Sequence, residues 1–182
     1  MIYGKRIRLR GVERSDLPQF QEWLNDPEVI EGLSIYLPLS MTDEEQWFER
    51  MSRLEQSEKP LAIEMKQGRG WRMIGNIGFF NIEWVNGCAE FGIFIGDRSI
   101  WNRGYGTEAV KLILRHGFET LNLHRIYLRV YSTNPRAKRS YEKAGFKLEG
   151  TLREAVYRRG RFADIHIMSV LRSEWDVAAE GK

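Results

Sequence analysis

A glycine-spaced turn between a strand and a helix constrains this chain more than any other segment. The turn is Trp101-Asn102-Arg103-Gly104-Tyr105-Gly106-Thr107, and an apolar helix is expected to follow it, from about Gly104 to Leu121. The first turn of a helix leaves backbone N–H groups without partners, and the helix dipole makes that end positive. A strand that leads into a glycine turn at a helix N-terminus therefore predicts a binding site for a pyrophosphate.

The same glycines admit other interpretations. The pattern Gly104-x-Gly106-x-x-Ala109 also matches a dinucleotide fingerprint. Nicotinamide binding is disfavoured, because the glycines do not directly follow a strand and because Ser132-Thr133-Asn134 follows the next strand in place of a carboxylate. No Gly-Lys-Ser/Thr sequence is present, which excludes a Walker A loop. A purely structural glycine turn remains open on this motif alone.

A second motif follows about 30 residues later. It consists of Asn134-Pro135-Arg136-Ala137, then Tyr141, then Gly145-Phe146. A helix is expected from about Pro135 to Ala144, because Gly145 suits the position after a helix C-terminus. Arg136, Lys138 and Arg139 lie at the start of this helix, where the dipole disfavours cations. Their placement suggests that a phosphate of a cofactor lies nearby.

The remaining elements indicate an α/β chain with a mostly antiparallel sheet. Ser15 is expected to cap one helix, and Thr42 with Glu45 a second helix that runs to about Ser57. The apolar segment 32–41 between these helices is either a buried connection or a wall of a substrate pocket. Asn86-Gly87 predicts a two-residue hairpin turn. Strands are expected over residues 7–10, 61–66, 73–82, 89–95, 125–131, 147–153 and 163–171.

Together, the two motifs over residues 88–171 resemble the GNAT family of acetyl-CoA-dependent N-acetyltransferases. The whole chain is similar to the RimJ/RimL-like branch of that family. The resemblance implies a GNAT fold, in which a mixed and mostly antiparallel twisted sheet is flanked by helices. It also implies a single domain over residues 1–182, with 173–182 as a loose tail, and acetyl-CoA as the co-substrate.

The resemblance also assigns cofactor-binding residues. The backbone groups of Phe94 and Ile95 would pair with pantetheine, Asn134 would hydrogen-bond the pantetheine arm, and Arg136 and Arg139 would lie near a phosphate. The family often has Gln or Arg where this chain has Trp101, and we expect this departure to be tolerated because backbone amides chiefly hold the pyrophosphate. The pyrophosphate would be wrapped by Trp101, Asn102, Arg103, Gly104, Tyr105, Gly106 and Thr107.

Two residues are candidates for catalysis. Tyr141 would lie beside the thioester sulfur and act as the acid, since a phenol with a pKa of about 10 is protonated at neutral pH; the alternative is a core aromatic. Glu90 would be either a general base, directly or through water, or an anchor for the substrate, and Asp97 is the second choice for the base. Cys88 has no His partner in the local sequence, which favours direct transfer in a ternary complex over a covalent intermediate.

Charge and composition bear on nucleic-acid binding, metal binding and cellular location. Residues 1–60 hold 8 Lys/Arg and 12 Asp/Glu, whereas residues 98–161 hold 15 Lys/Arg and 5 Asp/Glu. The basic part suits an anionic ligand. The sequence contains no nucleic-acid-binding motif, so we expect no nucleic-acid partner. A DNA-binding domain that uses the basic part is the alternative. The scattered histidines and the single cysteine predict no metal site. No apolar run is long enough for a membrane helix and the first ten residues lack a signal-peptide core, so a cytoplasmic location is expected.

The acceptor remains open at this stage. The acidic N-terminal part favours a cationic amine, which admits a protein N-terminus, a polyamine or an amino sugar. The RimJ/RimL-like resemblance favours the protein α-amine. A non-catalytic acyl-CoA-binding sensor is the non-enzyme alternative, and a homodimer is one of the oligomeric states left open.

Overall fold

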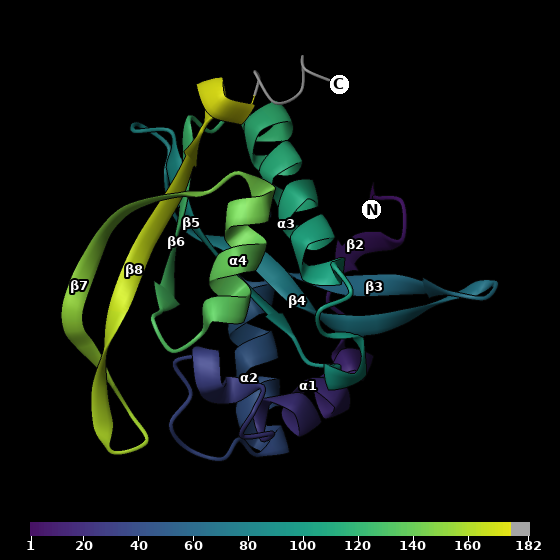
Figure 1. Ribbon diagram of the computed structural model, residues 1–182. Coiled ribbons are helices and arrows are strands. Elements are labelled where there is room, and N and C mark those ends of the chain that lie inside the picture. Colours follow the sequence, from purple (N-terminus) through teal and green to yellow (C-terminus); the bar gives the residue numbers. More distant parts are fainter. Residues whose placement is uncertain (176–182) are drawn as a thin grey trace.

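One eight-stranded sheet forms the centre of the computed structural model, which describes residues 1–175 (Figure 1). The strand order is β1-β2-β3-β4-β5-β6-β8-β7, and every neighbouring pair is antiparallel except β5 and β6. The expected mixed and mostly antiparallel sheet is therefore confirmed. The strands are β1 Ile2–Tyr3, β2 Ile7–Gly11, β3 Leu61–Gln67, β4 Gly70–Glu83, β5 Cys88–Ile95, β6 Arg125–Tyr131, β7 Lys147–Arg158 and β8 Arg161–Leu171.

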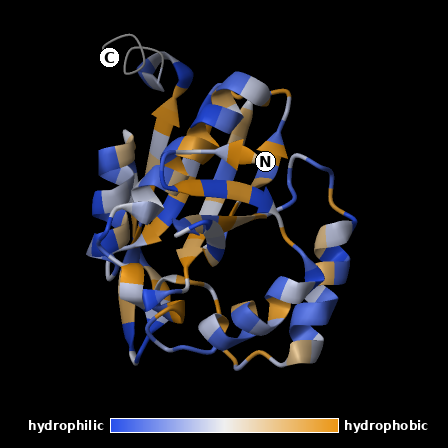
Figure 2. Cartoon of the chain, turned by 90° about the vertical axis from the view of Figure 1, so that its right-hand side faces the viewer, coloured by the Kyte–Doolittle hydropathy of each residue, from blue (hydrophilic) through white to orange (hydrophobic). Residues whose placement is uncertain are grey.

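Helices α3 and α4 lie next to each other on one face of the sheet, whereas α1 and α2 lie together at one end of the molecule (Figure 1). Hydrophobic and hydrophilic residues alternate along many of these elements, as expected of elements that bury one side (Figure 2). The helices are α1 Leu17–Leu24, α2 Met41–Ser52, α3 Tyr105–Arg115 and α4 Pro135–Ala144, with short turns η1 Arg14–Asp16, η2 Ile30–Gly32, η3 Arg98–Ile100 and a π-helical η4 His116–Thr120.

The core lies between the sheet and α3. Ile126 and Leu128 of β6 are almost fully buried, and so are Val110 and Ile113 of α3, which belong to the same apolar cluster. The alternating burial along β6 and the one-sided apolar pattern of α3 account for this packing. It fixes α3, and with it the glycine turn, against the centre of the sheet.

The two parallel strands of the sheet separate from each other. β5 and β6 pair only through Cys88–Glu90 and Arg125–Tyr127. Beyond that point β5 remains paired with β4 up to Ile95, and β6 remains paired with β8 up to Tyr131. Strands held by different neighbours diverge, so their carboxyl ends leave backbone groups that have no partner across the gap.

Both predicted N-caps of the N-terminal helices are wrong. Ser15 lies inside η1, where the N–H of Glu13 donates instead to Asp16 at 2.8 Å. Helix α2 is capped by Ser40, whose Oγ accepts from the N–H of Asp43 at 3.2 Å, while its own N–H donates to the Asp43 carboxylate at 2.8 Å. Asn25 fixes the chain just before this cap, since its Oδ1 accepts from the N–H of Leu39 at 2.8 Å.

The choice between the two possible caps can be tested by stability. Replacing Ser40 with Ala is expected to lower the free energy of unfolding by about 1 kcal/mol, because it removes the acceptor at the start of α2. Thr42→Ala is the matched control and should change stability by much less. Urea denaturation of both variants measures the difference; a larger loss for Thr42→Ala would contradict the observed cap.

Other boundaries differ from the expectation. The β4–β5 connection is a four-residue turn over 84–87 in which Gly87 has φ +60°, not the two-residue turn predicted from Asn86-Gly87. Strand β7 extends to Arg158 and ends in a tight turn whose residues Arg159 and Gly160 have φ +47° and +81°. Of the tail expected over 173–182, residues 173–175 lie in a last helical turn with Trp175 against Phe118, and 176–182 lie outside the described residues.

Candidate active site

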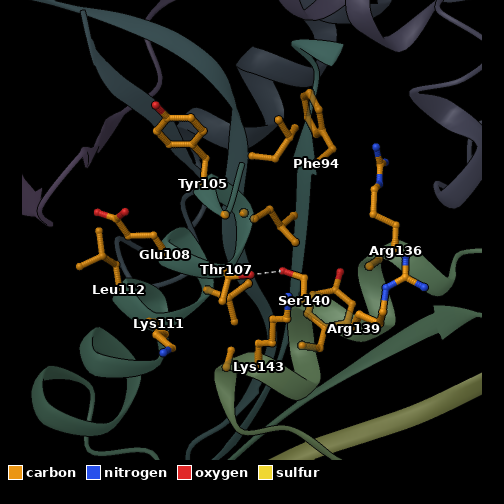
Figure 3. A pocket seen from close by; sticks show the side chains of 18 of the residues that line it. Phe94, Tyr105, Thr107, Glu108, Lys111, Leu112, Arg136, Arg139, Ser140 and Lys143 are labelled. Carbon is orange, nitrogen blue, oxygen red and sulfur yellow. Dashed lines mark hydrogen bonds between the residues drawn. The ribbon is translucent and has the colours of Figure 1, made fainter. Parts of the chain in front are cut away.

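A groove of about 1160 Å³ runs between α3, α4 and the carboxyl end of β5 (Figure 3). Most of the predicted site residues line it, although they are up to 47 positions apart in the sequence. These are Phe94, Ile95, Trp101, Asn102, Gly104, Tyr105, Gly106, Thr107, Asn134, Arg136, Arg139 and Tyr141. Of the predicted set, Arg103 and Glu90 do not line this groove.

The glycine turn presents free amides to the groove. Gly104 has φ +82° and precedes α3 without any side-chain cap, and the first helical hydrogen bond runs from Glu108 to the carbonyl of Gly104. Within residues 1–175, the N–H groups of Tyr105, Gly106 and Thr107 consequently have no acceptor. Three unpaired amides at a helix N-terminus form a suitable site for an anion.

Arg103 differs from the residues that follow it in the turn, and its part in wrapping the pyrophosphate stays a prediction. Its N–H donates to the carbonyl of Ile100 at 3.4 Å, so this amide is already used within the preceding turn. Its carbonyl accepts from Arg6 at 3.0 Å, and its side chain does not line the groove. The amide site accordingly begins after Arg103.

The turn between β1 and β2 supports the glycine turn from outside, which the sequence alone did not suggest. Arg6 pairs with Glu108 of α3 at 2.8 Å and lies 4.5 Å from the centre of the Tyr105 ring. Gly4, Lys5 and Arg6 line the groove at this point. These contacts join segments about 100 residues apart, and no motif in the sequence indicates them.

Trp101 contributes to the groove in an unexpected way. Its indole Nε1 donates to the carbonyl of Ile95 at 2.9 Å, and the guanidinium of Arg136 stacks 3.3 Å from the centre of its ring. The carbonyl of Ile95 therefore already accepts one hydrogen bond, and because a backbone carbonyl has two lone pairs, its pairing with pantetheine stays a prediction. Burial lowers the pKa of Arg136.

Asn134 has a structural role that the family pattern did not reveal. Its Oδ1 accepts from the N–H of Ala137 at 3.1 Å and thereby caps α4. Its Nδ2 points toward Gly32, where an added Cβ would lie only 2.5 Å away. Nδ2 thus remains for a ligand, and the last residue of η2 must be glycine for the chain to pass so close.

Tyr141 lies on α4 with its ring against Phe91 and Phe146, at 5.8 and 5.9 Å between ring centres. Its hydroxyl forms no hydrogen bond within the described part of the chain, and the residue lines the groove. Burial raises the pKa of Tyr141 to about 12, although the charge of Arg136 acts in the opposite direction. The phenol therefore carries its proton throughout the neutral range, as an acid must.

Glu90 lies away from Tyr141. The carboxylate is 4% exposed and binds Arg129 through two contacts of 2.8 and 2.9 Å. It alternates along β5 with Phe91, the residue that contacts Tyr141, so the two predicted catalytic side chains belong to opposite faces of the sheet. Burial disfavours the charged form of Asp97, but hydrogen bonds from Ser99 and Arg72 hold the pKa of its carboxyl below the ordinary value. Neither carboxylate is placed as a free base beside the groove.

This geometry favours a positioning role for Glu90. Replacing Glu90 with Gln is expected to lower turnover by the same factor at about pH 6.5 and about pH 9, because the change removes the ion pair that holds Arg129 rather than a proton acceptor. Steady-state kinetics at both pH values, together with a melting curve, measure this. A clearly larger loss at the lower pH would restore Glu90 as the base.

Residues 6–147 match the family model described as an acetyltransferase (GNAT) domain. The chain belongs to the GNAT family. Among residues 1–175, no group of three or more His, Cys, Asp or Glu side chains is arranged to hold a metal ion, and no helix has the length and apolarity to span a membrane.

Similar GNAT proteins cover almost the whole chain. An uncharacterised N-acetyltransferase p20 of Bacillus licheniformis is 30% identical over 96% of this chain and 97% of its own length. Spermidine N(1)-acetyltransferase of Vibrio cholerae is 31% identical over 94% of this chain and 96% of its own. A crystal structure of the Vibrio cholerae spermidine N-acetyltransferase with CoA and spermine superimposes with a TM-score of 0.85, at 28% identity, over 94% of this chain and 99% of that one.

Proposed function

We propose that this GNAT protein transfers the acetyl group of acetyl-CoA to a primary amine by direct attack in a ternary complex. One observation carries the proposal: three unpaired amides of α3 and the hydroxyl of Tyr141 belong to the same groove. The residues present fit the cofactor, because free amides and cations suit its phosphates, and the diverging strands β5 and β6 leave room for an extended arm. The solved relative with bound CoA supports the same conclusion.

The roles of the residues follow from this arrangement. Acetyl-CoA supplies an activated acetyl group as a thioester. The amine nitrogen bonds to the carbonyl carbon, the carbon–sulfur bond breaks, and the proton that nitrogen loses balances the one that sulfur gains. An ordinary thiol has a pKa of about 8.5 and is a stronger acid than a phenol near 12, so the hydroxyl of Tyr141 stabilises the departing sulfur mainly as a hydrogen-bond donor.

For the acceptor we propose a polyamine, in preference to the protein α-amine that the RimJ/RimL-like resemblance favoured. The relatives with a stated substrate in Vibrio cholerae and Escherichia coli are spermidine N(1)-acetyltransferases. A second cavity of about 210 Å³ shares Val29, Gly32, Trp101, Asn134 and Arg136 with the large groove. Two carboxylates, Glu28 and Glu31, line it; they pair with Arg98 at 2.6 Å and with Arg159 at 3.6 Å, and a cationic amine would share or replace these exposed partners.

One observation keeps the protein or peptide α-amine as a second candidate. The guanidinium of Arg158 lies 4.1 Å from the ring centre of Tyr36 and 5.4 Å from that of Tyr131, and it donates to the carbonyl of Leu33. It has no carboxylate partner among residues 1–175, and its Nε is buried without a hydrogen bond. Such a cation repels a polyamine and favours an amine with carbonyl or carboxylate oxygens nearby.

Thiol release from acetyl-CoA tests both candidates. The panel contains spermidine, spermine, short peptides with free N-termini, and glucosamine. We expect the highest kcat/KM for spermidine or spermine, and a preference for peptides would favour the second candidate instead. Binding of CoA without turnover on any amine would indicate an acyl-CoA-binding sensor, whereas absence of both binding and turnover would contradict the proposed function.

A further inference from the structure

The groove contains cations that the pyrophosphate site does not explain. Arg6, Arg115 and Arg136 of its lining are engaged with Glu108, with the carbonyl of Tyr3, and with Trp101. By contrast, the remaining cations of the lining form no ion pair and no side-chain hydrogen bond within the described residues. These are Lys5, Lys111, Arg139 and Lys143.

Two of these cations repel each other along α4. Arg139 and Lys143 are four residues apart, a spacing at which like charges destabilise a helix. The carboxylate of this helix, Glu142, lies 3.9 Å from Lys138 instead. A cluster that is unfavourable within the protein becomes favourable when an anion occupies the space between its members.

Lys111 and Lys143 lie at corresponding heights of two neighbouring helices. The hydroxyls of Thr107 and Ser140, 2.8 Å apart, join α3 to α4. Lys111 follows Thr107 by four residues and Lys143 follows Ser140 by three, and the two helices run in the same direction (Figure 1). Both lysines are thus about one helical turn, roughly 5.4 Å, beyond the bond. In Figure 3 they lie on the side of this bond opposite to Phe94.

This position matches a third phosphate of the cofactor. The free amides of residues 105–107 serve the diphosphate, which lies at the start of α3. Coenzyme A carries a further phosphate on the 3′ carbon of its ribose, one sugar ring away from the diphosphate. A phosphate monoester has its second pKa near about 6 and is close to a dianion at neutral pH, so it needs more than one cation.

We propose that Lys111 and Lys143, with Arg139 beside them, bind the 3′-phosphate and make the protein discriminate coenzyme A from 3′-dephospho-coenzyme A. This inference rests on the proposed function. It assigns a ligand group to two lysines that the sequence motifs did not single out.

Calorimetric titration with the two ligands tests the proposal. The wild-type chain is expected to bind coenzyme A at least about tenfold more tightly than 3′-dephospho-coenzyme A, which corresponds to about 1.4 kcal/mol. The double variant Lys111→Gln, Lys143→Gln should reduce this ratio to about threefold or less while its affinity for 3′-dephospho-coenzyme A is unchanged. The wild-type ratio should also fall as salt is raised, because the lysines are exposed.

Lys66→Gln is the matched control, since Lys66 of β3 is exposed, forms no ion pair within the described residues, lies outside the groove lining and should leave the ratio unchanged. Melting curves check that the double variant folds; we expect it to be at least as stable as the wild type, because a repulsion is removed. Equal affinity of the wild type for both ligands overturns the inference but leaves the proposed function intact. Equal weakening of both ligands in the double variant also overturns it, whereas failure of the wild type to bind either ligand contradicts the proposed function itself.

Discussion

Replacing Tyr141 with Phe is expected to lower kcat by about 10²- to 10³-fold and to leave the dissociation constant of coenzyme A nearly unchanged. The variant keeps the ring that packs on Phe91 and Phe146 and removes only the hydroxyl, which forms no hydrogen bond within residues 1–175. The substitution therefore removes the hydrogen bond to the departing sulfur and leaves the packing of the fold unchanged. Steady-state kinetics combined with calorimetric binding separates the two effects.

The pH profile adds a second test of Tyr141. Burial raises the pKa of its phenol to about 12, so the protonated form persists well above neutral pH. Turnover of the wild type should therefore not decline below about pH 10 through ionisation of this group. Tyr3→Phe is the matched control, because Tyr3 is exposed and lies outside the groove. A Tyr141→Phe variant with wild-type kcat would remove the residue from the mechanism.

Replacing Gly106 with Asp is expected to weaken binding of coenzyme A by more than about 100-fold, since it places a negative charge among the amides that face the diphosphate. The fold should tolerate the change. A Cβ at this position meets Ile95 and Ser140 at ordinary distances of 3.7 and 3.9 Å, and Asp in the first turn of a helix is stabilising by about 0.3–1 kcal/mol. Stability and ligand affinity should thus change in opposite directions.

Gly106→Asn separates charge from size. The two side chains have nearly the same volume, so Asn should cost about tenfold in affinity or less if charge dominates. Titration calorimetry and denaturant unfolding on both variants provide the comparison. An Asp variant that binds coenzyme A as tightly as the wild type would show that the diphosphate lies elsewhere.

Local patterns in the sequence were sufficient for much of the fold and of the groove. The alternation along β6, the apolar side of α3 and the terminal Gly145, which has φ +106°, each reflect the geometry of a single element. The glycine turn and the Asn134 motif follow the two parallel strands, and parallel strands bring their carboxyl ends to the same edge of a sheet. For that reason two motifs about 30 residues apart line one groove.

Contacts between distant segments were not predictable in the same way. Nothing near Glu90 in the sequence indicates that Arg129 takes its carboxylate, and nothing near Trp101 indicates a bond to the carbonyl of Ile95. The two possible capping boxes of α2, Ser40 with Asp43 and Thr42 with Glu45, have the same spacing, so spacing alone does not distinguish them. These features depend on tertiary packing, which periodicity and motif spacing do not encode.

The amide resonances of the glycines measure the central claim most directly. In a ¹⁵N-glycine-labelled sample, titration with coenzyme A should shift the signal of Gly106 strongly, because its amide gains a hydrogen bond at the start of α3, and that of Gly104 through the neighbouring charge. Gly11 and Gly68 lie outside the groove and should not move. Binding of coenzyme A that leaves Gly104 and Gly106 unchanged, or no binding at millimolar ligand, would contradict the account.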